Sequence, residues 1–247
     1  MEPDALRKAL LSRSALRAAS VTACMSAAGL LGACANINEA APLEVRDDGA
    51  TAVSLRSVLR IDPRRGHGVE FDFAQQRGRD TGSLGAGERL QFGSAAIDGP
   101  DSLHSEATVR SFHVAYNYLI PASGPLDAEV FAGIGRMDLK LHVQGSAPGA
   151  LIERTLGGSV LVAGIGPRLR LSEQFALEGR LSVATAFGTF RSHEKDSVDV
   201  ALAFRPASRI SVRAGYAWVK ATVDRNGADS NVAVRLRGPY FGLSLNF

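Results

Sequence analysis

"RISVRAGYAWVKATV", residues 209–223, places alternate side chains on two faces of different character. One face carries Ile210, Val212, Ala214, Tyr216 and Trp218, and the other carries Ser211, Arg213, Gly215 and Ala217. A period of two residues is typical of a β-strand that meets a different medium on each side. The segment therefore predicts a sheet with one apolar face and one polar face that bears charges.

The same alternation recurs along most of the chain, between clusters of turn-forming residues. It is clear in 51–61, 67–76, 106–120, 128–143, 158–171, 175–190, 196–204, 209–223 and 231–247, and weaker in 41–47. Most of these segments exceed the five or six residues usual in soluble sheets and suit strands that cross a bilayer at a tilt. We expect an all-β fold, a closed antiparallel up-and-down transmembrane β-barrel of eight to ten strands, with ten favoured. A soluble barrel or sandwich is the alternative, because alternation alone also describes one.

The charged faces are expected to line the lumen of this barrel. The predicted lumen network comprises Arg56, Arg60, Glu70, Asp72, Arg136, Asp138, Lys140, Arg168, Arg170, Glu178, Arg180, Asp199, Arg213, Arg235 and Arg237. The apolar faces, which include Phe131, Met137, Leu139 and Leu141, are expected to face lipid. Buried charges need partners, and these cations outnumber the acids.

Aromatic residues and the lengths of the connections predict how the barrel is oriented in the membrane. Tyr116, Tyr118, Tyr216, Trp218 and Tyr240 lie towards strand ends, where aromatic girdles meet the membrane interface. The connections at 62–66, 121–126, 172–174 and 205–208 are short, as periplasmic turns are, whereas 78–104 is a long loop by its polar, glycine-rich composition. Both termini are expected in the periplasm if the strand number is even.

The N-terminal segment predicts export. Residues 1–34 combine a basic stretch, a short apolar run and small residues, as in a helical signal peptide. "LGAC" (31–34) is similar to a bacterial lipobox and implies lipidation at Cys34, while Ala33-Cys34-Ala35 also fits an ordinary signal-peptidase site. Residues 35–50 are then a periplasmic segment with a possible short first strand, and 51–247 the barrel. Without residues 1–33 the 28 basic and 25 acidic residues fall to 24 and 23, so no nucleic-acid partner is expected.

The C-terminus ends on "GPYFGLSLNF" (238–247), with Phe241, Leu243, Leu245 and Phe247 at every second position. Upstream, Val232, Val234 and Leu236 have the opposite parity. This change of phase predicts a bulge or bend near Gly238-Pro239, since proline cannot donate to the ladder.

With "FAGIGR" (131–136), "VAGIGPRLR" (162–170) and this terminal strand, the sequence resembles the small outer-membrane β-barrel proteins of Gram-negative bacteria, the OmpA-like or opacity-protein-like class. The resemblance implies an outer-membrane location with membrane lipids as surroundings. It also implies a monomer, and a C-terminal strand read by the barrel-assembly machinery.

The polar residues carry no strong catalytic or metal pattern, so no cofactor or metal is expected. His104 and Ser105 suggest a lipid A deacylase-like hydrolase only weakly, because neighbours in a strand point to opposite faces. "RSHEKD" (191–196) is interpreted as a charged surface loop. The favoured function is a non-enzymatic barrel with a structural or surface-interaction role. The alternatives are a narrow, anion-leaning pore and a lipid-modifying enzyme.

Overall fold

The computed structural model describes residues 41–247 except 63–65, 121–123, 188–192, 208 and 224–230. Within this part of the chain every regular element is a strand, and no helix is long and apolar enough to cross a membrane. The predicted signal peptide and Cys34 lie outside the described residues.

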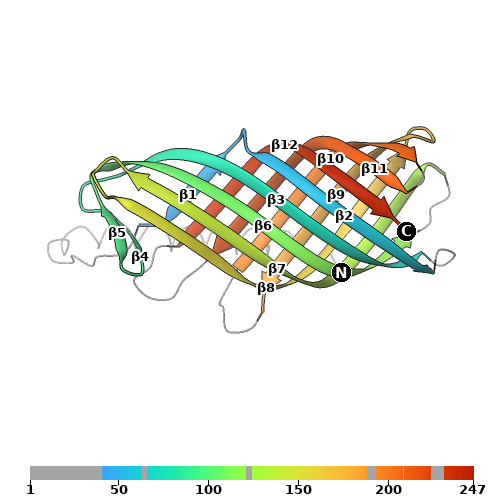
Figure 1. Ribbon diagram of the computed structural model, residues 1–247, viewed down its shortest axis with the longest axis horizontal. Coiled ribbons are helices and arrows are strands. Elements are labelled where there is room, and N and C mark those ends of the chain that lie inside the picture. Colours follow the sequence, from blue (N-terminus) through green and yellow to red (C-terminus); the bar gives the residue numbers. More distant parts are fainter. Residues whose placement is uncertain (1–40, 63–65, 121–123, 188–192, 208, 224–230) are drawn as a thin grey trace, which may run out of the picture. The chain divides into compact units, whose positions relative to one another are not determined.

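Ten of the twelve strands form one sheet, and two form a separate hairpin (Figure 1). Strands β4 and β5 pair with each other. In chain order the strands are β1 Leu43–Asp47, β2 Thr51–Asp62, β3 His67–Leu84, β4 Arg89–Phe92, β5 Ala95–Asp98, β6 Asp101–Ile120, β7 Leu126–Gly145, β8 Leu151–Arg170, β9 Phe175–Ala186, β10 His193–Ala207, β11 Ile210–Val223 and β12 Val232–Asn246.

The sheet closes into a barrel because β12 pairs with β2 as well as with β11. Nine strands run around it in the order β2, β3, β6, β7, β8, β9, β10, β11, β12. Neighbours are antiparallel except β12 and β2, which are parallel. An odd number of strands that alternate in direction leaves the first and last strands parallel. The predicted closed all-β barrel is confirmed, and the expected number of ten strands, with eight as the alternative, is corrected to nine.

The segment at 41–47, whose alternation is weak, does not add a tenth barrel strand. It forms β1, and β2 continues along the same edge of β12 after a kink. Both pair in parallel with the same edge of β12. Asp47 pairs with Leu236, whereas Ala52 pairs with Tyr240, so the β1–β2 side has one residue more than β12. That extra residue forms a bulge in the turn between β1 and β2.

The bulge predicted at Gly238-Pro239 is therefore wrong. β12 pairs continuously with β11 from Val232 to Leu245. Val234 points inward and Phe241 points outward, because the apolar face of β12 is the inner one near its start and the outer one near its end. The kink lies across the ladder in β1–β2, where the Ala50 N–H donates to the Arg237 carbonyl over 3.0 Å.

The odd strand number puts the two chain ends of the barrel at opposite ends. Leu43 at the start of β1 pairs with Val232 at the start of β12. Phe247 lies at the other end, where its N–H donates to the Val58 carbonyl. The short connections after β2, β6, β8 and β10 share the end that holds Phe247. The expectation that both termini lie at one end required an even strand number and does not hold.

Along the long strands the apolar residues change from the outer to the inner face. In β6, Phe112 and Tyr116 point outward and are half exposed, while His113 between them is buried. Further towards the start of β6, Val109 and Leu103 point inward and are buried, and the outward positions are polar. The strand keeps its pleat throughout, so the medium on each face must change partway along.

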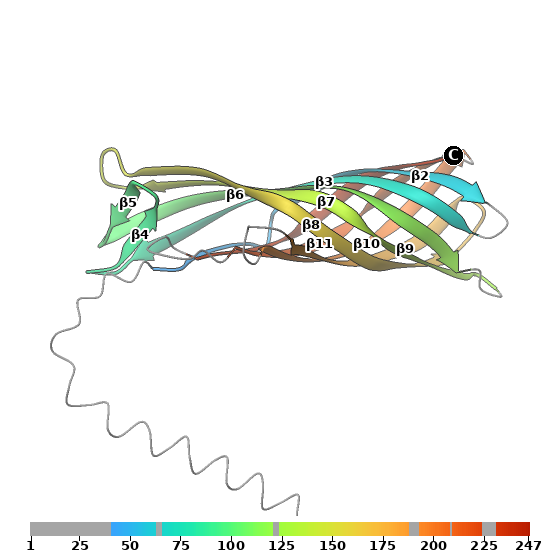
Figure 2. The same ribbon diagram turned by 90° about the horizontal axis from the view of Figure 1, so that it is seen from below.

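We call the part with an apolar outer face the belt half and the part with an apolar inner face the extension half. The belt half comprises 51–61, 67–75, 111–120, 126–135, 160–171, 175–187, 197–207, 210–219 and 238–247. The extension half comprises 43–47, 76–110, 136–159, 220–223 and 232–237. Strands β3, β6, β7 and β8 are the longest and carry the extension furthest (Figure 2).

The extension half encloses an apolar core and is closed by the β4–β5 hairpin. Leu139, Val143 and Val234 of this core are fully buried. Phe92 of β4 is buried with them, and the Arg154 guanidinium donates to the Phe92 carbonyl over 2.6 Å. The long loop expected at 78–104 is thus largely wrong. β3 continues to Leu84 and β6 begins at Asp101, and the two four-residue strands between them are too short to show a period in the sequence.

Two aspartates connect β1 and β3 in the extension half by accepting backbone hydrogen bonds. The Arg46 N–H donates to Asp80 Oδ2 and the Arg79 N–H donates to Asp47 Oδ2, each over 2.8 Å. These carboxylates take the place of ladder carbonyls where β1 has no regular pairing with β3.

We expect Gly238→Ala to destabilise the barrel at its seam. A Cβ at Gly238 would lie 1.7 Å from the Ala50 carbonyl oxygen, a backbone atom that cannot rotate away. Overpacking of this kind costs about 1–3 kcal/mol, measured as a lower midpoint in urea unfolding. Gly82→Ala in β3 is the control, because nothing lies within 4 Å of its Cβ. Equal midpoints for the two variants would contradict this account of the seam.

Candidate functional site

The centre of the belt half is filled by an ionic network around Glu70, a fully buried residue of β3. Arg56 of β2 donates to Glu70 Oε2 over 2.7 Å, and Arg180 of β9 pairs with Glu70 Oε1. Asn117 donates to Oε2 over 3.0 Å, and His113 Nε2 lies 3.3 Å from Oε1. Both oxygens of this carboxylate are therefore satisfied by strands from different sides of the barrel.

Glu129 of β7 is the second acid of the network. It pairs with Arg56 and lies 3.7 Å from the Arg60 guanidinium and 3.6 Å from that of Arg180. Glu129 was not predicted, because it stands next to a turn at the start of its strand. The alternation around Glu129 does not show which face is polar, because Phe131, two residues further on, points inward as Glu129 does.

Phe131 supports the network from the side of the apolar core. The Arg180 guanidinium carbon lies 3.7 Å from the centre of the Phe131 ring, within cation–π range. The His113 ring stacks on the same phenyl group with centroids 5.9 Å apart. Arg180 thus has a carboxylate on one side and a π-face on the other, which fixes its position.

A second cluster lies nearer the short-turn end. Glu178 of β9 accepts from Arg168 over 2.8 Å, and Arg205 lies 3.5 Å away. Arg213 of β11 lies beside this cluster and donates to Ser54, whose hydrogen bond of 2.7 Å to the Tyr240 hydroxyl lies on the side of the network towards the apolar core. Together the two clusters draw side chains from every strand of the barrel and fill the lumen of the belt half.

A cavity of about 70 Å³, lined by polar and apolar side chains, lies between the network and the apolar core. Lys195 of β10 projects into it and donates to Ser111 over 2.8 Å. Asp72 and Gln76 of β3 also line it, and neither makes a hydrogen bond with any of the described residues. Because unpaired buried polar groups are costly, water is the simplest occupant of such a cavity.

Lys195 corrects the interpretation of 191–196 as a surface loop. β10 begins at His193, and Lys195, Ser197 and Asp199 alternate on its inner face. The sequence held a usable signal, since Val198 and Val200 alternate with the same residues. The charged composition of the segment hid it.

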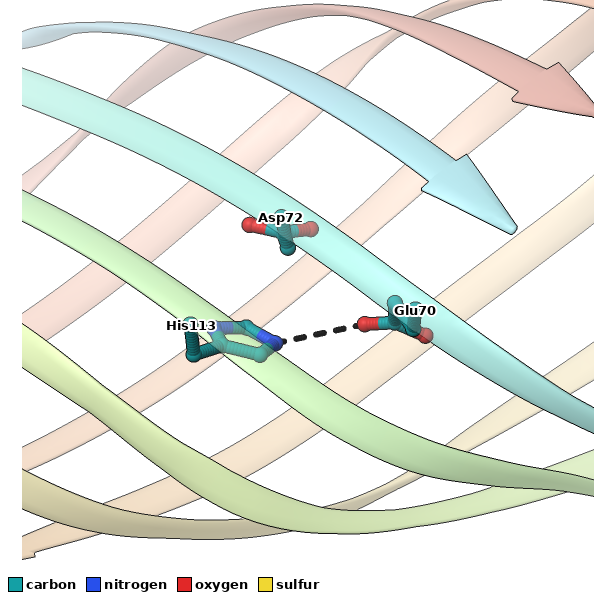
Figure 3. Close-up of side chains that lie close together, drawn as sticks. All are labelled: Glu70, Asp72 and His113. Carbon is teal, nitrogen blue, oxygen red and sulfur yellow. Dashed lines mark hydrogen bonds and ion pairs between the residues drawn. The ribbon is translucent and has the colours of Figure 1, made fainter. Parts of the chain in front are cut away.

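Glu70, Asp72 and His113 could each offer one ligand atom to a metal ion (Figure 3). Their atoms lie within 4.8 Å of one another. However, both Glu70 oxygens already bind guanidinium groups, and a cation placed there would have to displace Arg56 or Arg180. The arrangement fits an ion-pair network better than a metal centre.

The structure places nine of the predicted lumen residues on the inner face: Arg56, Arg60, Glu70, Asp72, Arg168, Glu178, Arg180, Asp199 and Arg213. Arg170 lies at the short-turn mouth and pairs with Asp127 over 3.2 Å. Five others, Arg136, Asp138, Lys140, Arg235 and Arg237, are corrected to the outer face of the extension half.

The apolar residues of β7 that were expected to face lipid are also misplaced, for the same reason as these five charged residues. Phe131, Met137, Leu139 and Leu141 are buried inside. In β7 the apolar positions change parity after Ile134, so a single face assignment for the whole strand had to fail in one half.

Four of the five aromatic residues predicted for the interface lie on the outer face of the barrel. Tyr116, Tyr216 and Trp218 are partly exposed on the outer face of the belt half, and Tyr118 shares that face. Tyr240 points inward and is buried against Ser54. Of the C-terminal residues, Phe241, Leu243, Leu245 and Phe247 lie on the outer face.

His104 and Ser105 do not form a catalytic pair. Ser105 points inward and is buried, whereas His104 points outward on the surface of the extension half. The nearest acid along the strand, Glu106, pairs with Arg77 over 2.6 Å.

Comparison of the chain with protein-family models, with curated proteins and with solved structures finds no match. The function is therefore inferred from the fold and from the placement of side chains.

We expect Glu70→Gln to destabilise the barrel by about 3–5 kcal/mol, the cost of leaving buried charges uncompensated. The change keeps the shape of the side chain but removes one of the two carboxylates that Arg56 and Arg180 share, and leaves Glu129 alone between them. Urea unfolding followed by tryptophan fluorescence measures the difference. Glu153→Gln is the control, since this exposed residue pairs with exposed His142 and with no other residue of the described chain. An equal, small effect of both substitutions would show that the network does not hold the barrel together.

Proposed function

We propose that the protein is an outer-membrane β-barrel whose belt half crosses the bilayer and whose extension half projects beyond it. The exchange of faces along the strands carries this proposal. An apolar outer surface with a charged interior suits hydrocarbon surroundings, and a polar outer surface with an apolar interior suits water. A soluble barrel would not have the apolar outer surface of the belt half. A barrel embedded in lipid along its whole length would not have the polar outer surface of the extension half.

The dimensions of the belt half support the proposal. Outward apolar residues run from Phe112 to Ile120 in β6 and from Leu126 to Ile134 in β7. These stretches match the 9–11 residues with which a tilted strand crosses a bilayer. Closure through β2 and β12 leaves no open edge in this half, as hydrocarbon surroundings require.

Aromatic pairs mark both margins of the belt half. Tyr216 and Trp218 lie 4.9 Å apart at the margin towards the extension half, where Arg237 and Lys220 come next along the ladder. His67 and Tyr118 lie 5.1 Å apart near the short-turn end. Amphipathic rings at these two levels suit the two interfaces of a membrane.

A structural or surface-interaction role fits this architecture best. The ionic network fills the lumen of the belt half, and the apolar core of the extension half continues the obstruction up to the β4–β5 hairpin. Both argue against the pore alternative, because ions would have to pass an apolar interior. The separation of His104 from Ser105 argues against the hydrolase alternative. The barrel then serves to hold the extension half at the membrane surface.

The usual orientation of bacterial barrels places short turns in the periplasm. With that orientation the extension half is exposed outside the cell, and Leu43, where β1 begins, lies on the outer side. The C-terminal strand ends in the periplasm, as expected of an assembly signal.

The single tryptophan, Trp218, provides a direct test. In vesicles made with lipids brominated at different depths, we expect its fluorescence to be quenched most by bromine close to the headgroups. In Trp218→Phe/Leu181→Trp the reporter moves to the middle of the belt half, and we expect bromine deep in the acyl chains to quench it most.

The matched control is Trp218→Phe/Thr155→Trp, which puts the reporter on the outer face of the extension half and should show no quenching by either lipid. Uniform quenching at the three positions, or a protein that stays soluble and shows no heat-dependent shift on a gel, would contradict the proposal.

A further inference from the structure

A basic patch lies on the outer face of β3, β6 and β7, directly beyond the belt half. Four cations form it, Arg77, Arg110, Arg136 and Lys140. Pairing across the strands fixes their level, since Phe112, at the margin of the belt half, pairs with Arg136. The next rows place Arg110 opposite Asp138 and Lys140 opposite Thr108, which in turn pairs with Arg77.

Two of these four charges have no acidic partner among the residues that the structure describes. Arg77 pairs with Glu106 over 2.6 Å, and Arg136 pairs with Asp138 over 3.0 Å. In contrast, Arg110 donates to the neutral amide of Gln75 over 2.8 Å. Lys140 makes no hydrogen bond or ion pair with any described residue. The patch therefore has charge available for an anion.

Two adjoining hollows continue the patch onto the extension half. One has a volume of about 480 Å³ and is lined by Lys140, Thr108 and Thr155 among others. The other has a volume of about 380 Å³ and is lined by His104 and Gln144 among others. Both include Glu106 and His142. Carboxylate, guanidinium, hydroxyl, amide and imidazole groups all line these hollows, and such a mixture of donors and acceptors suits a ligand rich in hydroxyl groups.

We propose that this face binds a membrane glycolipid whose headgroup carries phosphate. The inference rests on the proposed membrane insertion and adds the class of lipid. Phosphate would lie at Arg110 and Lys140, which favour it by charge. The sugar would occupy the two hollows, and the acyl chains would lie along the exposed Phe73, Phe112 and Ile134 of the belt half.

Continuity with the belt half favours a lipid over a free anion. The uncompensated charges lie one or two rows beyond the last outward apolar residues, which is the depth of lipid phosphates next to a barrel. The hollows favour a sugar-bearing headgroup over a small one, because a small headgroup leaves them unfilled.

The test uses the full chain in detergent micelles and native mass spectrometry. We expect the protein to retain lipid A, a phosphorylated disaccharide lipid, in preference to phosphatidylglycerol and phosphatidylcholine. Arg110→Ser/Lys140→Ser should weaken lipid A retention about tenfold or more, given about 1 kcal/mol for each cation near an anionic surface. Arg209→Ser/Lys220→Ser is the matched control, since it removes the same charge from exposed positions off this face.

Several outcomes would overturn the inference. They are unchanged retention in Arg110→Ser/Lys140→Ser, an equal loss in the control, equal retention of phosphatidylglycerol, and full displacement of lipid A by inorganic phosphate. The first two would remove the basic patch from the binding site. Equal retention of phosphatidylglycerol would remove the sugar from recognition, and displacement by phosphate would indicate a soluble anion as the ligand.

Failure of this inference is separable from failure of the proposed function. A protein that inserts with Trp218 at the headgroup level but shows no lipid preference contradicts the glycolipid site alone. A protein that does not insert contradicts both.

Discussion

Strict alternation of side chains in a strand is the constraint on which the rest of this structure depends. A strand cannot turn its apolar residues from outside to inside without a bulge, unless the sequence itself moves them to the other parity. This chain does the latter: in β6, for example, Phe112 and Val109 lie three residues apart and on opposite faces. Strands β3, β6, β7, β8, β11 and β12 therefore enclose charges in one half and, together with β1, a hydrocarbon core in the other.

The two interiors hold the barrel together by different physical means. In the belt half the cost of burying charge is met by multiple partners, as Glu70 and Glu129 share Arg56 and Arg180. In the extension half the same inward positions carry aliphatic side chains, whose burial stabilises by about 25 cal/mol per Å². The cavity at Lys195 lies at the transition, where small side chains leave space between the two kinds of packing.

The sequence predicted the fold well and the site in part, and one physical reason explains most of the difference. Alternation is a local property, so strands and closure could be predicted from it, as could the inward placement of Glu70 and Arg180. Which face is inside is a property of the surroundings, and a single choice for each strand misplaced Arg136 and Met137 together. The number of strands depended on whether Leu43–Asp47 is a separate barrel strand. The sequence does not show this, because the answer lies in the pairing of β1 and β2 with the same edge of β12.

The parallel contact between β2 and β12 also bears on how such a barrel can arise. A barrel that grows or shrinks by whole hairpins always changes by two strands, so its parity is preserved. Nine strands cannot be reached from eight or ten by that route. A nine-stranded barrel differs from either by a single strand, and here the kinked β1–β2 segment, both parts of which pair with β12, forms the closing edge.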